Sequence, residues 1–261
     1  MEEDRSVLSR AARAPDSTLT YGADADQVAD LWAGPSADQA RPLVLLIHGG
    51  FWRPAFDRSH LSPMAEALAA IGWTVASVEY RRRPGKPDLT VADVRRAVEV
   101  LPAKIAGHSG RALVVGHSAG GHLVLWLAAS GAGPPPAFGR SVARAPAALS
   151  VLSGALALAP AADLALAHSL GLGNGAVTAF LGGDPDDWPQ LDPRRMSAPA
   201  VKTTIVHGES DAIVPIELSK SYAAAHPSVR LSSLPDTGHF ALIDPLSPAW
   251  RAVSSELLGL R

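Results

Sequence analysis

Three residues of types suited to nucleophilic catalysis follow one another along this chain in the order serine, aspartate, histidine. Ser118 lies in Gly116-His117-Ser118-Ala119-Gly120, a G-x-S-x-G pattern that directly follows the apolar run Leu113-Val114-Val115. A serine on a sharp strand-to-helix turn presents its hydroxyl at a helix start, where the dipole favours negative charge. The turn is too tight for larger neighbours, so glycine is required on both sides. The sequence therefore predicts Ser118 as a nucleophile.

A second serine lies in a similar but incomplete pattern. Gly107-His108-Ser109-Gly110 has Arg111 where the second glycine belongs, and no strand precedes it. We interpret this segment as a turn.

His239 and Asp211 are the predicted base and acid. His239 follows the last predicted strand, in Asp236-Thr237-Gly238-His239-Phe240, and it completes the chain order serine, acid, histidine that such hydrolases use. Asp211 follows the strand Thr203 to Val206, and the turn Ile213-Val214-Pro215 after it suits an aspartate at the inner bend of the loop. Glu209 is the alternative acid. The acid would hold the imidazole tautomer and stabilise the imidazolium.

A glycine-rich loop predicts an oxyanion hole. His48-Gly49-Gly50-Phe51-Trp52 follows the apolar run Leu43 to Ile47, and consecutive glycines let backbone N–H groups approach a developing oxyanion. We assign the donors of this loop to the N–H groups of Gly50 and Phe51, with Gly49 as a possible partner. The second donor is the N–H of Ala119, the residue after the nucleophile. His48 is expected to hold the loop through hydrogen bonds.

Four residues are candidates for substrate binding. They are Phe51, Trp52, His117 and Trp188. For the aromatic residues the alternative interpretation is packing in the core.

Apolar runs and helical periodicity alternate along the chain, which predicts a parallel sheet covered on both faces. The predicted strands are 28–32, 43–47, 74–78, 112–115, 155–158, 203–206 and 229–234. The predicted helices are 58–71, 91–105 with Thr90 as N-cap, 120–129, 216–225 and 250–258. Every residue nominated for chemistry should then lie just after a strand, where active sites of such sheets occur.

The predicted fold class is α/β, an α/β-hydrolase fold with a mostly parallel central sheet flanked by helices on both faces. We divide the chain into an N-terminal arm, residues 1–20, and a hydrolase domain, residues 21–261. Residues 163–199 are long, rich in Gly, Pro and Asp, and weakly periodic. An insertion of this size is more often functional than not, so we interpret it as a small cap over the site; a plain surface excursion is the alternative.

Composition narrows the function classes. The formal net charge of −2 gives no reason to expect a nucleic-acid or anionic-membrane partner, and the runs Arg81-Arg82-Arg83 and Arg194-Arg195 are interpreted as solvated faces or substrate-gate residues. The chain has no cysteine, which excludes disulfides and thiolate catalysis, and it shows no metal-ligand spacing. No cofactor and no metal are expected. No signal peptide or membrane span is visible, so a cytoplasmic protein is expected.

Several of these motifs together resemble a known superfamily. The segments are His48-Gly49-Gly50-Phe51-Trp52, Tyr80-Arg81, Gly116 to Leu123, His207-Gly208-Glu209-Ser210-Asp211 and Gly238-His239-Phe240. They resemble the α/β-hydrolase superfamily, within it the esterase/lipase group with an H-G-G oxyanion motif, and most closely the kynurenine formamidase (arylformamidase) branch. The chain departs from many such esterases at Phe51, where they have a third glycine.

The resemblance implies hydrolysis of a small carboxylic ester or aryl amide through an acyl-enzyme. The expected partner is a small-molecule ester or amide, and a homodimer stays open. Three hypotheses remain: a carboxylesterase of broad small-ester scope, an arylformamidase, and a non-catalytic binding protein or receptor that kept the fold.

Overall fold

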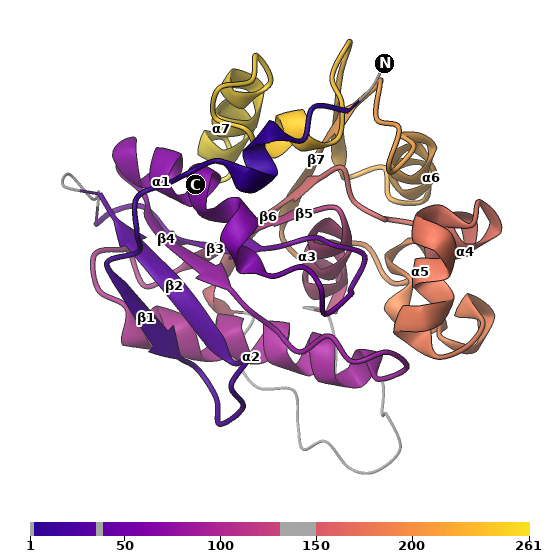
Figure 1. Cartoon of the computed structure of the whole chain (residues 1–261), viewed down its shortest axis with the longest axis horizontal. Coiled ribbons are helices and arrows are strands. Elements are labelled where there is room, and N and C mark those ends of the chain that lie inside the picture. Colours follow the sequence, from indigo (N-terminus) through magenta and orange to yellow (C-terminus); the bar gives the residue numbers. More distant parts are fainter. Residues whose placement is uncertain (1–2, 35–38, 131–149) are drawn as a thin grey trace.

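The computed structural model describes residues 3–34, 39–130 and 150–261. A mixed sheet of eight strands runs through the molecule in the order β1-β2-β4-β3-β5-β6-β7-β8 (Figure 1). β1 and β2 pair antiparallel to their neighbours, and all later pairings are parallel. The strands are β1 (Ser17–Thr20), β2 (Val28–Ala33), β3 (Leu43–Ile47), β4 (Thr74–Val78), β5 (Ala112–His117), β6 (Leu152–Leu158), β7 (Lys202–Gly208) and β8 (Arg230–Leu234).

The central strands are buried on both faces because their side chains alternate between two hydrophobic cores. In β3, Leu43, Leu45 and Ile47 belong to one core, and Val44 and Leu46 to the other. Helices α1 and α7 cover the second core, while α2 and α3 lie beneath the first (Figure 1). This double burial explains why the strands appear in the sequence as unbroken apolar runs.

Seven α-helices and several short 3-10 turns connect the strands within the described residues. The α-helices are α1 (Ser62–Ala70), α2 (Pro87–Lys104), α3 (Ala119–Ser130), α4 (Leu164–Ser169), α5 (Leu172–Leu181), α6 (Glu217–Ala225) and α7 (Trp250–Leu258). None of the helices in the part of the chain described is long and apolar enough to cross a membrane. The predicted helix over 58–71 is η2 (Arg58–Leu61) followed by α1.

Helix α2 begins earlier than predicted. Pro87 occupies its first turn, where a missing N–H costs no hydrogen bond. Thr90 is therefore inside the helix, and its hydroxyl donates to the carbonyl of Arg81 instead of capping.

Residues 3–20 form two short elements that the sequence did not indicate. Ser17–Thr20 forms edge strand β1, and Ser6–Ser9 forms a 3-10 turn, η1. Val7 is buried in the core beside α1 and α7, and Arg10 forms an ion pair with Asp244. These contacts attach residues 3–20, the predicted N-terminal arm, to the rest of the fold.

Residues 163–199 contain α4, α5 and three short 3-10 turns. Four positions at the start of α5 have left-handed backbone, among them Asn174, which explains the weak periodicity of this stretch. Gly173 lies against the ring of Phe51, and Arg53 donates to the carbonyl of Gly173. The segment is thus in contact with the loop that follows β3.

Candidate active site

The nucleophile turn joins β5 to α3. Ser118 has a φ of 58°, a left-handed conformation that a non-glycine residue adopts only when its surroundings impose it. A Cβ on Gly120 would overlap the carbonyl oxygen of Ile47, and one on Gly116 would overlap that of Gly120. The two glycines are therefore needed for the close approach of α3 to the ends of β3 and β5, as the sequence predicted.

Asp211 and His239 lie together at the carboxyl ends of β7 and β8. The Nδ1 atom of His239 is 2.6 Å from Oδ2 of Asp211, so Nδ1–H donates to the carboxylate and Nε2 is left with its lone pair. Both side chains are almost fully buried. The other carboxylate oxygen accepts from the N–H groups of Ile213 and Val214 at 2.8 Å each. The rival Glu209 is exposed.

His207 is a second histidine on the same carboxylate. Its Nε2 lies 2.8 Å from the carbonyl oxygen of Val214 and 3.3 Å from Oδ2 of Asp211. Both neighbours accept, so Nε2 carries the hydrogen. Burial raises the pKa of Asp211, but the hydrogen bonds from His207 and His239 and the charge of His239 outweigh it and hold that pKa below its ordinary value. Asp211 is therefore a carboxylate throughout the neutral range.

The loop after β3 has three consecutive residues with positive φ: Gly50 (106°), Phe51 (54°) and Trp52 (55°). The backbone N–H groups of Gly50 and Phe51 donate to no other residue in the described part of the chain. The N–H of Ala119, the first residue of α3, lacks an acceptor within its own helix. Gly49 packs against Ser118, since a Cβ on it would lie 3.0 Å from the serine Cβ. Gly50 and Phe51 line the same cavity as Ser118, so their assignment as oxyanion donors stays a prediction that fits this arrangement.

A buried polar cluster holds this loop. His48 is fully buried, with Nδ1 2.8 Å from the carbonyl oxygen of Gly49 and Nε2 3.0 Å from Oε1 of Glu79. Burial and the nearby charge of Arg82 lower its pKa to about 3, so His48 is neutral. Its Nδ1–H donates to the carbonyl of Gly49, and its Nε2 accepts from Nη1 of Arg82 at 2.8 Å, which supports the loop as expected. Arg82 is itself buried and paired with Glu79. The interpretation of Arg82 as part of a solvated run is therefore wrong.

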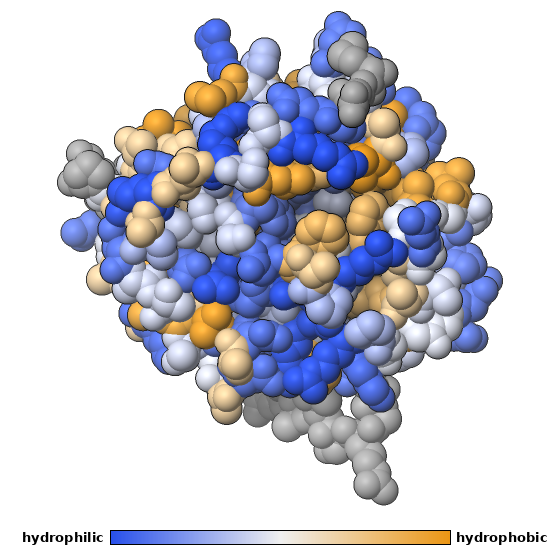
Figure 2. Space-filling model, in the orientation of Figure 1, coloured by the Kyte–Doolittle hydropathy of each residue, from blue (hydrophilic) through white to orange (hydrophobic). Residues whose placement is uncertain are grey.

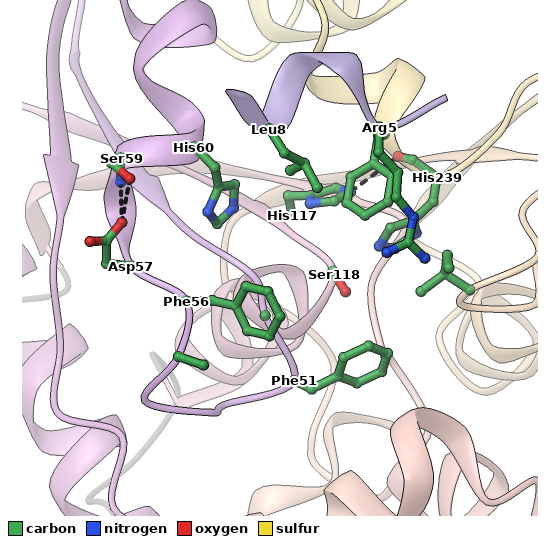
Figure 3. Close-up of a pocket in the computed structure, with 14 residues that line it drawn as sticks. Arg5, Leu8, Phe51, Phe56, Asp57, Ser59, His60, His117, Ser118 and His239 are labelled. Carbon is green, nitrogen blue, oxygen red and sulfur yellow. Dashed lines mark hydrogen bonds between the residues drawn. The ribbon is translucent and has the colours of Figure 1, made fainter. Parts of the chain in front are cut away.

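Two cavities meet at Ser118 and Phe51. The larger has a volume of about 420 Å³ and is also lined by His239, His117, Phe56, Phe240 and His60 (Figure 3). The smaller, of about 10 Å³, holds roughly one water-sized group. Apart from Ser118 its lining is apolar and includes Trp52, Ala119 and four residues of the 163–199 segment, namely Ala167, Leu172, Ala176 and Val177.

Three of the four predicted substrate-binding residues line a cavity, and the fourth does not. Phe51 lines both cavities and Trp52 the smaller one, where its ring stacks on Phe180 at 4.7 Å. His117 lines the larger cavity, but its Nε2 lies 3.1 Å from the carbonyl oxygen of His239. Burial and the charge of His239 lower the pKa of His117, so it is a neutral donor to the base's backbone. Trp188 packs against the core and lines neither cavity.

The N-terminal segment, residues 3–10, contributes contacts that no pattern in the sequence indicated. The carboxylate of Glu3 accepts from the N–H of His239 at 2.9 and 3.0 Å and from the N–H of Ala212 at 3.1 Å. Arg5 and Leu8 line the larger cavity. In Figure 1 this segment, in indigo, passes beside α7 and the short turn that follows His239. On the same face, apolar surface gathers near the centre among hydrophilic side chains (Figure 2).

The sheet order and the placement of Ser118, Asp211 and His239 after strands define an α/β-hydrolase fold. Within it, the chain belongs to the BD-FAE family, whose family model matches residues 29–225. Its fold is similar to that of esterase B from Lactobacillus rhamnosis, with a TM-score of 0.74, 20% identity and coverage of 95% of this chain and 86% of that one.

The curated relatives that this chain matches are longer than it. The probable carboxylic ester hydrolase LipM of Mycobacterium tuberculosis is 28% identical over 247 residues, covering 87% of this chain and 56% of LipM. Kynurenine formamidase of Danio rerio is 34% identical over 106 residues, covering 40% of this chain and 36% of that protein. The chain thus spans about half the length or less of these relatives.

Proposed function

We propose that this protein is a serine hydrolase that cleaves small carboxylic esters or aryl formamides through an acyl-enzyme. One observation carries the proposal: Ser118, held in a left-handed turn, opens into the same cavity as His239, whose Nδ1–H is bound to a buried carboxylate. The ester hydrolase name of LipM, and the formamidase name of the shorter match, support this class of reaction.

The mechanism follows from the arrangement. Oγ of Ser118 adds to the substrate carbonyl carbon while its proton passes to Nε2 of His239, and the oxyanion accepts from the N–H groups of Gly50, Phe51 and Ala119. Collapse breaks the bond to the alcohol or amine, which leaves with the proton from His239. Water then attacks the acyl-serine with His239 again as base, which releases the acid and restores Ser118.

The proposal gives each side of the substrate its own cavity. The acyl group would occupy the small apolar cavity, with room for a hydrogen or one methyl beyond the carbonyl, and the leaving group the larger one. Formyl and acetyl compounds should therefore be cleaved, and acyl chains of about eight carbons or more poorly. Discrimination per methylene is only about 1–3 kcal/mol, so the decline should steepen over several carbons.

Purified protein should hydrolyse p-nitrophenyl acetate, and Ser118→Ala should reduce kcat by up to about 10⁶-fold. Ser109→Ala is the matched control, and it should be silent because Ser109 lies in a surface turn. Hydrolysis by the Ser118 variant at the wild-type rate would refute the assignment. A folded wild-type protein with no turnover of any short ester or N-formyl anilide would favour the non-catalytic alternative. A cytoplasmic location and a homodimer stay predictions.

A further inference from the structure

The N-terminal segment brings a cation to the cavity that holds Ser118 and His239. Arg5 lines this cavity, and its guanidinium lies over the ring of Phe240, 5.5 Å from the centroid. Figure 3 shows Arg5 reaching from the N-terminal segment to the side of His239. The Arg5 side chain forms no hydrogen bond or ion pair with another residue in the ranges that the structure describes. A cation that is placed but unpaired is available to a ligand.

Contacts on both sides of Arg5 fix its backbone. On one side, Glu3 accepts from the N–H groups of His239 and Ala212. On the other, Val7 is buried and Arg10 is paired with Asp244. Arg5 therefore lies at a defined place beside the catalytic histidine, although its side chain is exposed.

The carboxylates in the N-terminal segment and in this cavity accept hydrogen bonds from groups other than Arg5, and Asp4 accepts from the N–H of Ser6. Glu3 accepts three backbone hydrogen bonds, and Asp57, which lines the same cavity, accepts from the N–H and hydroxyl of Ser59 at 2.9 and 2.5 Å. Asp211 is occupied by two histidines and two backbone N–H groups. A ligand carboxylate would thus meet little competition for the guanidinium, whose planar donors match a carboxylate in two parallel hydrogen bonds.

We propose that Arg5 is a specificity residue that binds a carboxylate on the leaving group, so that the preferred substrates are short acyl esters or amides of an anionic alcohol or aniline. This inference rests on the proposed function. It also assigns the N-terminal segment a role: the segment completes the leaving-group side of the cavity, opposite the small apolar cavity that would take the acyl group.

The test compares two esters that differ in one charge, 3-acetoxybenzoate and its methyl ester. The readout is the ratio of their kcat/KM values, in which the intrinsic reactivity of each ester cancels between protein variants. Wild-type protein at low ionic strength should show a ratio about five- to tenfold higher than Arg5→Gln, with Arg5→Lys intermediate because lysine keeps the charge but not the planar donors. Arg251→Gln, an exposed arginine on α7, is the matched control and should keep the wild-type ratio.

Salt provides an independent readout. Raising the ionic strength to about 1 M shortens the screening length to about 3 Å, which should lower the wild-type ratio toward that of Arg5→Gln and leave the variant's ratio nearly constant. An unchanged ratio in Arg5→Gln, or an equal loss on both esters, would overturn the subsite while leaving the hydrolase intact. If wild-type protein cleaved neither ester nor p-nitrophenyl acetate, the proposed function itself would fail, and the subsite with it.

Discussion

Asp211→Asn tests the hydrogen-bond pattern around the proposed acid. All four groups that contact the Asp211 carboxylate are N–H donors: Nδ1 of His239 and Nε2 of His207 on one oxygen, and the backbone of Ile213 and Val214 on the other. An asparagine has one accepting atom and one donating atom. Either orientation of the amide therefore points a donor at donors.

The less costly orientation keeps the amide oxygen on the two backbone N–H groups, because a buried unsatisfied donor costs about 1–3 kcal/mol. His207 then retains the carbonyl of Val214. His239 must then adopt the other tautomer, in which Nδ1 accepts from the amide and Nε2 carries the proton. In that form Nε2 cannot take the proton of Ser118. An analogous aspartate-to-asparagine change in a serine protease lowers kcat about 10⁴-fold, which corresponds to about 5.4 kcal/mol of transition-state stabilisation.

The assay is hydrolysis of p-nitrophenyl acetate by Asp211→Asn, with Glu209→Gln as the matched control. Both variants replace a carboxylate by an amide, two residues apart on one loop, but Glu209 is exposed. We expect a loss of about 10⁴-fold in kcat for Asp211→Asn and nearly full activity for Glu209→Gln. Thermal unfolding checks that the first variant is folded. A loss in Glu209→Gln with activity retained in Asp211→Asn would refute the reasoning and exchange the two roles.

Three further predictions concern the Phe51 ring, the buried histidines and the close backbone approach at Gly120. Phe51→Ala should raise kcat/KM for butyrate and longer esters relative to acetate, because removing a ring that lines both cavities makes room while the backbone donor remains; a series from acetate to decanoate with an unchanged slope would contradict this. Burial lowers the pKa of His48 to about 3 and of His60 and His122 to about 4, so between pH 6.5 and about 4 the unfolded chain binds protons that the folded one does not. The free energy of unfolding, measured by urea denaturation, should then fall on acidification by about 1.36 kcal/mol per pH unit for each such histidine; a flat profile over this range would refute it. Gly120→Ala should unfold at markedly lower temperature than Gly183→Ala, because a Cβ on Gly120 would lie 2.1 Å from a backbone oxygen whereas one on Gly183 would meet nothing closer than 3.9 Å; equal losses would contradict the packing argument.

The sheet could be predicted because its central strands are buried on both faces and form unbroken apolar runs. Strands β3 and β4 begin and end at the predicted residues. β1 was missed because Ser17–Thr20 is a polar, mostly exposed edge strand, which gives no period-two pattern. Helix α5 was missed because left-handed residues such as Asn174 interrupt its periodicity, and α4 was missed because its six residues are too few to show one.

The site was predictable to the extent that its chemistry lies in local motifs. The strand-to-helix setting of Ser118 and the chain order of the acid and base indicated which residues to compare, and the structure brings Asp211 and His239 into contact. Contacts between distant segments left no trace in the sequence. Glu3 meets His239 across 236 positions, and His207 shares Oδ2 of Asp211 with the base. The positive φ of Phe51 could not be foreseen either, since a bulky residue rarely adopts it.

The central claim is that Ser118 forms a covalent intermediate, and intact-protein mass spectrometry with an organophosphate tests it most directly. Such a reagent phosphorylates an activated serine and releases its leaving group, and the resulting ester is stable enough to be mapped by proteolysis. The account predicts one added phosphoryl group, located on Ser118, with loss of p-nitrophenyl acetate hydrolysis in step with labelling and no label on Ser118→Ala. A label on another residue that abolishes activity, or full activity in protein labelled on Ser118, would contradict it.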